Sequence, residues 1–312
     1  MKRTRQNKKY YPYPEDKFLL ERGDELYNKR KPDLILTSDW HLREDPPTCF
    51  MGDFQKEQWD SVGFIAGLQL QYNCPVLHAG DLFHHWKPSP WLLTNSSSLL
   101  PEEFISIYGQ HDLPQHNMQL SEKCGLFNLH INGKLTLLRG CHYGQVPNMD
   151  HVFHIKGNAI LVWHHMTYIN PPYPGATGGN AISILRKYPQ FDLIVTGDNH
   201  QSFTTKYQGR LLVNPGNLTR QVADQMDYQP RVALWYADTN AITWVNIPVQ
   251  EGVISREHIE RKESRDARID AFVSKLDGDW VAGMSFEENL EAFFAKNDTR
   301  ESVKQIIYKG IE

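Results

Sequence analysis

Long apolar runs are absent from this 312-residue sequence, and so is a strong excess of charge of one sign. No uninterrupted apolar stretch approaches the roughly 18 residues that a membrane-spanning helix needs, so nothing supports a membrane role. The formal net charge of -4 argues against a generally basic surface that coats nucleic acid. A local basic patch remains compatible with that total, and residues 1–10 hold one, which either contacts phosphate or is a solvated end.

Cysteine is scarce, with four residues (Cys49, Cys74, Cys124 and Cys141) at neither the spacing of a zinc site nor that of a disulfide framework. The N-terminus lacks an apolar segment that resembles a signal peptide. Internal repeats and low-complexity tracts are missing as well. These absences predict reduced thiols and a cytoplasmic protein.

Between residues 33 and 200, short apolar runs alternate with longer mixed segments. Each run is almost continuously apolar, as expected of a strand covered on both faces, and several intervals leave room for a crossover helix. We therefore predict an α/β core. The runs are DLILTSD (33–39), PVLHAGD (75–81), EFISIYG (103–109), AILVWHH (159–165) and FDLIVTGD (191–198).

The remainder of the sequence predicts two hairpins, with turns at 208–209 and 238–240, and then charged helices. Ser285 and Glu288 form a capping box at the start of one helix. The apolar stripes of these helices either pack onto the protein or bind a partner. We divide the chain into a basic N-terminal segment (1–32), a main domain (33–250) and a helical extension (251–312).

Acidic, imidazole and amide side chains follow all five apolar runs. Functional groups of open α/β sheets gather at the carboxyl ends of the strands. A single Asp or His at such a place is commonly a cap or a hydrogen-bonded residue, but a whole cluster needs compensating charge, which divalent cations supply. A ligand set without cysteine suits manganese, iron or zinc at five- or six-coordinate sites. The residues are Asp39, His41, Asp81, Gln110, His111, Asp112, His164, His165, Asp198 and His200.

If one carboxylate bridges two ions, the site is a two-metal hydrolase of the kind that acts on phosphate esters. Asp81, the sole acid of its loop, is the natural bridge. The order of the five motifs, from Asp39-Trp40-His41 to Gly197–His200, resembles the calcineurin-like metallophosphoesterases over residues 33 to about 220. This resemblance implies an α/β fold, a four-layer α/β/β/α sandwich. The segments TSDWHL, GDLFHHWKPSP and NPGNLTR further resemble the nuclease branch typified by the SbcD subunit of SbcCD.

The resemblance implies two divalent metal ions, with Mn²⁺ preferred and Mg²⁺, Fe²⁺ or Zn²⁺ as alternatives. The first ion would be held by Asp39, His41, Asp81 and His200, and the second by Asp81, Gln110, His164 and Asp198. Two positions depart from the family pattern, which has Asn in place of Gln110 and His in place of Asp198. A charged oxygen ligand favours harder metals, so occupancy of the second site is expected to differ from that of the family.

The resemblance also implies that metal-activated hydroxide attacks phosphorus while His111, oriented by Asp112, protonates the leaving group. Further substrate contacts are expected from four side chains near the motifs: His84, His85, Lys87 and Arg43. A nuclease groove would also have Trp86, Trp91, Arg186, Lys187 and Arg220 available.

The predicted activity is a metal-dependent DNA exonuclease or endonuclease of SbcD type. One alternative is a phosphodiesterase or phosphatase acting on nucleotides or phosphoproteins, and another is a non-catalytic module that keeps the fold and binds a partner. The expected partners are DNA, an SbcC-type ATPase and a second copy of the chain. About sixty residues follow residue 250, which is too few for a DNA-capping domain plus docking helices, so a minimal form or a smaller substrate is expected.

Overall fold

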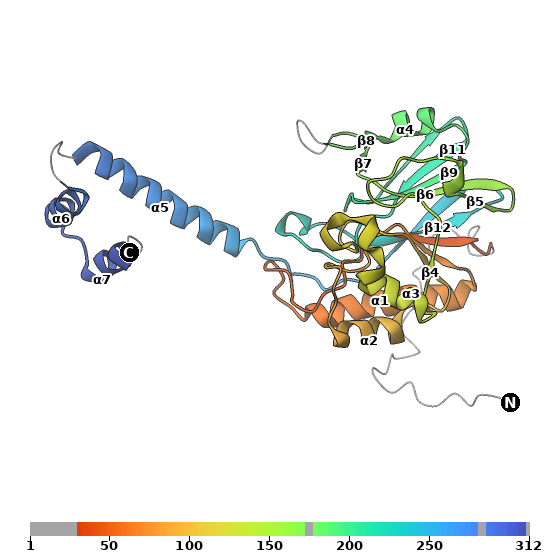
Figure 1. Ribbon diagram of the computed structural model, residues 1–312, viewed down its shortest axis with the longest axis horizontal. Helices are drawn as coiled ribbons and strands as arrows, with labels where there is room; N and C mark the ends of the chain where they lie inside the picture. Colours follow the sequence, from red (N-terminus) through yellow and green to blue (C-terminus); the bar gives the residue numbers. More distant parts are fainter. Residues whose placement is uncertain (1–29, 172–176, 280–284, 310–312) are drawn as a thin grey trace.

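Two β-sheets form the centre of the molecule (Figure 1). The computed structural model describes residues 30–171, 177–279 and 285–309, with the backbone alone for 269–279 and 286. The six-stranded sheet has the order β13-β12-β1-β2-β3-β4 and the five-stranded sheet has the order β10-β11-β9-β6-β5. The first sheet holds β1 (Leu34–Thr37), β2 (Val76–His78), β3 (Phe104–Ser106), β4 (Thr136–Leu137), β12 (Arg231–Tyr236) and β13 (Ala241–Asn246). The second holds β5 (Val152–Ile155), β6 (Asn158–His164), β9 (Leu193–Gly197), β10 (Phe203–Tyr207) and β11 (Arg210–Asn214), and β7 (Thr167–Tyr168) pairs with β8 (Gly179–Asn180) beside them.

Both faces of the central strands are buried, which explains their continuous apolar sequence. In β1, Leu34 and Leu36 pack between the two sheets, where Val162 and Val195 of the other sheet meet them. Ile35, which points the opposite way because side chains alternate along a strand, packs with the helices outside the first sheet. The five apolar runs are confirmed as β1, β2, β3, β6 and β9.

Helices cover the outer face of each sheet and complete four layers. The apolar side chains of α1, α2 and α3 share a core with the first sheet, and those of α4 share a core with the second. Asp53 caps α1 by accepting the Lys56 N–H, and Ser89 caps α2 in the same way through Leu92. The predicted α/β/β/α sandwich is therefore what the chain forms. The helices are α1 (Phe54–Tyr72), α2 (Pro90–Leu99), α3 (Gly125–Ile131) and α4 (Ala181–Lys187), and 3₁₀ turns occupy Pro114–His116, Met118–Lys123, Met149–His151 and Ala223–Gln225.

The two predicted hairpins are confirmed. The strands β10 and β11 turn at Gln208 and Gly209, which both have positive φ, and β12 and β13 turn through residues 237–240. The second hairpin places β12 antiparallel to β1, so the chain returns to the centre of the first sheet after completing the second.

A helical extension leads away from the sandwich (Figure 1). It consists of α5 (Glu257–Asp279), α6 (Phe286–Lys296) and α7 (Glu301–Lys309). The predicted capping box of Ser285 and Glu288 is confirmed at the start of α6. Leu290, Phe293 and Phe294 of α6 form a small core with two side chains of α7. Residues 1–29 of the predicted basic segment lie outside the described residues. Among the residues that are described, no helix is long and apolar enough to cross a membrane.

Candidate metal centre

The loops that follow β1, β2 and β9 turn three carboxylates toward one point. Asp39, Asp81 and Asp198 all have positive φ, at 50°, 58° and 79°, a conformation that side-chain-bearing residues adopt at a cost of about 1 kcal/mol or more. Glycine makes the close approach of these loops feasible. A Cβ on Gly109 would lie 2.1 Å from Asp81 Oδ1, and one on Gly80 would lie 2.5 Å from His164 Nδ1.

Two imidazoles and two carboxylates form one half of the cluster. The Nε2 atom of His41 lies 3.2 Å from Nε2 of His200, 4.0 Å from Asp39 Oδ1 and 3.8 Å from Asp81 Oδ2. The Asp39 carboxylate also accepts the backbone N–H of Asp198, which ties the loop after β9 to the loop after β1. These are the residues predicted for the first metal ion.

The other half of the cluster is built around His164 at the end of β6. Its Nε2 atom lies 3.4 Å from Asp81 Oδ2 and 2.7 Å from the amide oxygen of Gln110. The Gln110 amide nitrogen in turn donates a 2.6 Å hydrogen bond to Asp198 Oδ1. These are the residues predicted for the second metal ion, and Asp81 is common to both halves.

The donor atoms of this cluster fit divalent cations. Asp81 Oδ2 is buried and accepts no hydrogen bond from the described residues, although it lies between His41 and His164. On the opposite side of the His164 ring, Nδ1 lies 2.7 Å from the carbonyl oxygen of Ala79, an arrangement that leaves Nε2 for a ligand. Three-residue groups with converging donor atoms occur at Asp39, His41 and His200 and at Asp39, Asp81 and His164.

Burial and mutual charge shift the ionisation of these side chains strongly. Burial raises the pKa of Asp39 to about 8, with Asp81 adding to the effect. Although burial works against both charges, Asp81 and His164 stabilise each other, which lowers the pKa of Asp81 and raises that of His164 to about 10. Burial lowers the pKa of His41 and of His200. A cation bound at His164 therefore has to displace a proton, and its affinity falls with falling pH.

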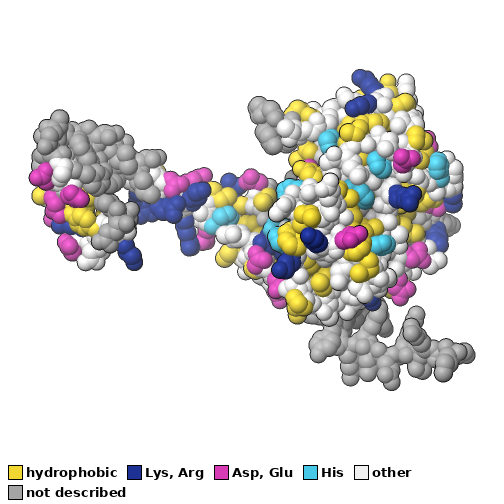
Figure 2. Space-filling model, viewed as in Figure 1, with side chains coloured by type: hydrophobic (Ala, Val, Ile, Leu, Met, Phe, Trp, Pro, Cys, Tyr) yellow, Lys and Arg dark blue, Asp and Glu magenta, His cyan; other side chains and the backbone are white. Residues whose placement is uncertain are grey.

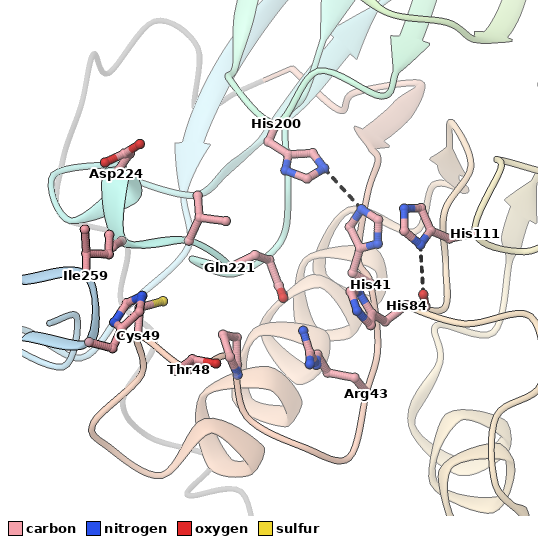
Figure 3. A pocket seen from close by; sticks show the side chains of 14 residues that line it. His41, Arg43, Thr48, Cys49, His84, His111, His200, Gln221, Asp224 and Ile259 are labelled. Atoms are coloured by element: carbon pink, nitrogen blue, oxygen red, sulfur yellow. Dashed lines mark hydrogen bonds between the residues drawn. The ribbon is translucent and has the colours of Figure 1, made fainter. Parts of the chain in front are cut away.

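His111 and His84 lie beside the cluster at the edge of an open cavity (Figure 3). The His111 ring is 4.7 Å from the His41 ring between centroids, and His84 stacks on His111 at 5.5 Å. Burial, with a contribution from Arg43, lowers the pKa of His84 to about 4. His41, His84 and His111 form a third group of converging ring nitrogens.

The predicted orientation of His111 by Asp112 is wrong. His111 Nδ1 lies 2.8 Å from the backbone carbonyl oxygen of His84, which holds the ring instead. The buried Asp112 carboxylate accepts four backbone N–H groups, those of Asp81, Leu82, Phe83 and Gly109, at 2.9 to 3.3 Å. Asp112 therefore fixes the two loops that carry Asp81 and His111, and it acts as a positioning residue.

The predicted substrate contacts divide into two groups. Arg43 and His84 line the cavity, whereas His85 and Lys87, both exposed, are absent from the described residues that line it. Arg220 is not available to a substrate, because it is buried against Glu57 and donates to the carbonyl oxygen of Gln250. The other groove candidates lie elsewhere: Arg186 and Lys187 are on α4, Trp86 packs against the main core, and Trp91 faces Trp59.

The cavity has a volume of about 510 Å³ and extends from the histidines to the start of α5 (Figure 3). Its far wall is formed by Thr48, Gln221, Asp224, His258 and Ile259, none of which the sequence pattern singled out. They come from three separate loops and helix starts, so no motif spacing connects them. The site therefore has room for a group larger than a phosphate.

Comparison with known proteins gives a family match and solved structures of low similarity. A family model described as "Calcineurin-like phosphoesterase superfamily domain" matches residues 34–239. An archaeal phosphodiesterase is 13% identical with a TM-score of 0.40, over 68% of this chain and 98% of that one. A metallophosphoesterase from Sphaerobacter thermophilus is 14% identical with a TM-score of 0.36, over 70% of this chain and 89% of that one. No curated protein matches significantly.

Proposed function

The chain belongs to the calcineurin-like phosphoesterase superfamily, and on that premise we propose that it is a metal-dependent nuclease that hydrolyses phosphodiester bonds in DNA. The observation that supports a diester is the cavity of about 510 Å³ beside the ligand cluster. A phosphomonoester needs room for one substituent on phosphorus, whereas a diester needs room for two. The cavity continues past His111 and His84 to His258, which leaves space for the second substituent.

The ligand cluster is proposed to hold two divalent cations, with Asp81 shared between them. Bound ions of this kind polarise phosphoryl oxygens and acidify a coordinated water. Asp39, His41 and His200 would hold the first, and His164, Gln110 and Asp198 the second. The oxygen-rich second set favours manganese or magnesium over zinc.

The histidines at the cavity edge carry the remaining roles. His111 would donate a proton to the departing oxygen, and the His84 carbonyl oxygen holds its ring for that step. Arg43 and the His84 side chain, which line the same cavity, would contact the other phosphate oxygens.

Two alternatives compete with this proposal. A phosphatase or phosphodiesterase acting on nucleotides or phosphoproteins would use the same ligands, and an interaction module would need none of them. Binding of an SbcC-type ATPase through the helical extension, a homodimer and a cytoplasmic location stay predictions.

The discriminating experiment offers four substrates to the purified protein with manganese: a phosphodiester dye, the matching monoester, and labelled single- and double-stranded DNA. The proposal expects cleavage of the diester and of DNA, and loss of both in Asp81→Asn. Cleavage of the monoester with DNA untouched would contradict the nuclease proposal. Absence of metal-dependent turnover on every substrate would favour the interaction module.

A further inference from the structure

A second hollow lies next to the first cavity, along α5. It has a volume of about 500 Å³ and shares Thr48 and His258 with the first. Its remaining wall includes Met51, which is 66% exposed, and three basic side chains of α5, Arg261, Lys262 and Arg265. The two hollows are therefore neighbours that lie between the histidines of the metal centre and the basic side chains of α5, and we call the pair the trough.

One side of α5 is mainly basic. Residues three and four apart share a helix face, and His258, Arg261, Lys262 and Arg265 follow that spacing. At 100° per residue, Glu260 and Glu263 fall on the opposite side, whereas Glu257 and Asp266 lie at the two edges of the basic side, and Glu257 also lines the second hollow. Lys and Arg side chains gather on this stretch of the helix in the space-filling view (Figure 2). We call the residues 261, 262 and 265 the basic face.

The body of the protein fixes the direction in which the basic face points. Ile254 and Ile259 at the start of α5 pack on the small core of Cys49, Phe50 and Phe54. The backbone of residue 255 donates to the carbonyl oxygen of Cys49 at 2.8 Å. The first turn of α5 is therefore attached to the same loop that lines both hollows, and the basic face lies at the end of the trough.

We propose that the basic face holds the phosphate backbone of a polynucleotide strand whose scissile phosphate lies at the metal centre. This inference rests on the proposed nuclease function and names the surface that selects a polymer over a small diester. From His258 to Arg265 the helix rises by about 10 Å, at 1.5 Å per residue. That length spans about three phosphates at 3.4 Å per nucleotide of a duplex strand.

The acidic partners of the basic face do not compete strongly with phosphate. Arg261 contacts Glu257 at 2.8 Å and Arg265 contacts Asp266 at 3.2 Å, but the two arginine side chains are 81% and 67% exposed. Exposed ion pairs of this kind contribute little free energy. A phosphate can therefore replace either acid, and Met51 offers an apolar contact to a base or sugar.

The test compares two triple variants with the wild-type protein on a phosphodiester dye and on a labelled 20-nucleotide DNA. The first variant is Arg261→Ala, Lys262→Ala and Arg265→Ala. The control variant also replaces three basic residues by alanine, at Arg186, Lys187 and Lys206, which are exposed on α4 and β10. For the first variant we expect a loss of about tenfold or more in affinity for DNA and wild-type turnover of the dye. Its slope of log affinity against log salt should fall by about 2 for single-stranded DNA.

Three results would overturn the role of the basic face without contradicting the nuclease proposal. Equal losses in both triple variants would assign the effect to total charge. DNA cleavage unchanged in the first variant would remove α5 from the substrate path. If the first variant lost the binding of the wild-type protein to vesicles of phosphatidylcholine and phosphatidylserine but kept its binding to DNA, the basic face would be assigned to a membrane. Wild-type protein that turns over the dye but neither binds nor cleaves DNA would contradict the nuclease proposal itself.

Discussion

The Gln110 amide nitrogen donates a 2.6 Å hydrogen bond to Asp198 Oδ1, which joins the two positions where the sequence departs from the family pattern. Through this bond the Gln110 amide oxygen is turned toward His164 Nε2, 2.7 Å away. The Gln110 side chain, which is longer than that of Asn, and the Asp198 carboxylate thus hold each other in place beside Asp81. Two substitutions that look separate in the sequence act together in the structure.

The pair should show strong coupling in a double-mutant cycle. Gln110→Asn shortens the arm and Asp198→His removes the acceptor, so each single change is expected to weaken binding of the second manganese ion. The double variant restores the residue types of the family and should bind better than the two losses combined would predict, by about 0.5–3 kcal/mol. Manganese titration of all four proteins measures this coupling. Gln221→Asn, the same change at another residue of the cavity, is the control. If the losses of manganese affinity in the two single variants simply add in the double variant, Gln110 and Asp198 act independently.

The role of His111 predicts a dependence on the leaving group. His111→Ala should lower kcat by about 10²–10⁴-fold for DNA, which releases a poor alkoxide leaving group. The loss should be much smaller for a nitrophenyl diester, whose leaving group departs without a proton. His84→Ala keeps the carbonyl oxygen that holds His111, so it should raise KM and leave the leaving-group dependence unchanged. Equal losses on both substrates in His111→Ala would rule out proton donation.

The four hydrogen bonds of Asp112 predict a stability effect. Asp112→Ala leaves four backbone N–H groups without their acceptor and should lower the free energy of unfolding by about 3 kcal/mol or more. Urea unfolding measures the loss, and Asp150→Ala at an exposed position is the control. If Asp112 instead acted directly in catalysis, its alanine variant would lose turnover while keeping wild-type stability.

His78 predicts an acid-dependent loss of stability. Burial lowers its pKa to about 3, and its Nδ1 atom lies 2.9 Å from Ser106 Oγ. Because the unfolded state titrates near 6.5, it binds more protons than the folded state between pH 6.5 and pH 3. The contribution of His78 to the free energy of unfolding is therefore fully present above pH 6.5. Below pH 6.5 it falls by up to about 1.4 kcal/mol per pH unit.

His78→Leu should flatten this dependence in urea unfolding measured at pH 7, 6 and 5. Ser106 keeps a hydrogen-bond partner in the variant, since its hydroxyl also donates to the Ile107 carbonyl oxygen. The same substitution at the exposed His154 is the control and should leave the dependence as it is in the wild type. Parallel curves for wild type and His78→Leu would show that His78 does not cause the acid sensitivity.

The α/β core and the gathering of ligand side chains at the strand ends could be predicted from short-range sequence patterns, whereas the four-layer sandwich and the division of the ligands between two ions were implied by the resemblance to the family. Strands buried on both faces read as continuous apolar runs, and strand ends meet at one sheet edge. The orientation of His111 could not be predicted, because it depends on the backbone path of the loop that presents the His84 carbonyl oxygen. The burial of Arg220 against Glu57 depends on a contact between residues 163 positions apart, which no local pattern records.

The sharing of Asp81 between two metal ions is tested most directly by anomalous diffraction, measured near the manganese absorption edge from crystals grown with manganese. We expect two anomalous peaks about 3.5–4 Å apart on either side of Asp81. One should contact His41 and His200, and the other should contact His164, Gln110 and Asp198. A single peak at His41 and His200, in crystals of protein that hydrolyses a phosphodiester, would contradict the shared role of Asp81.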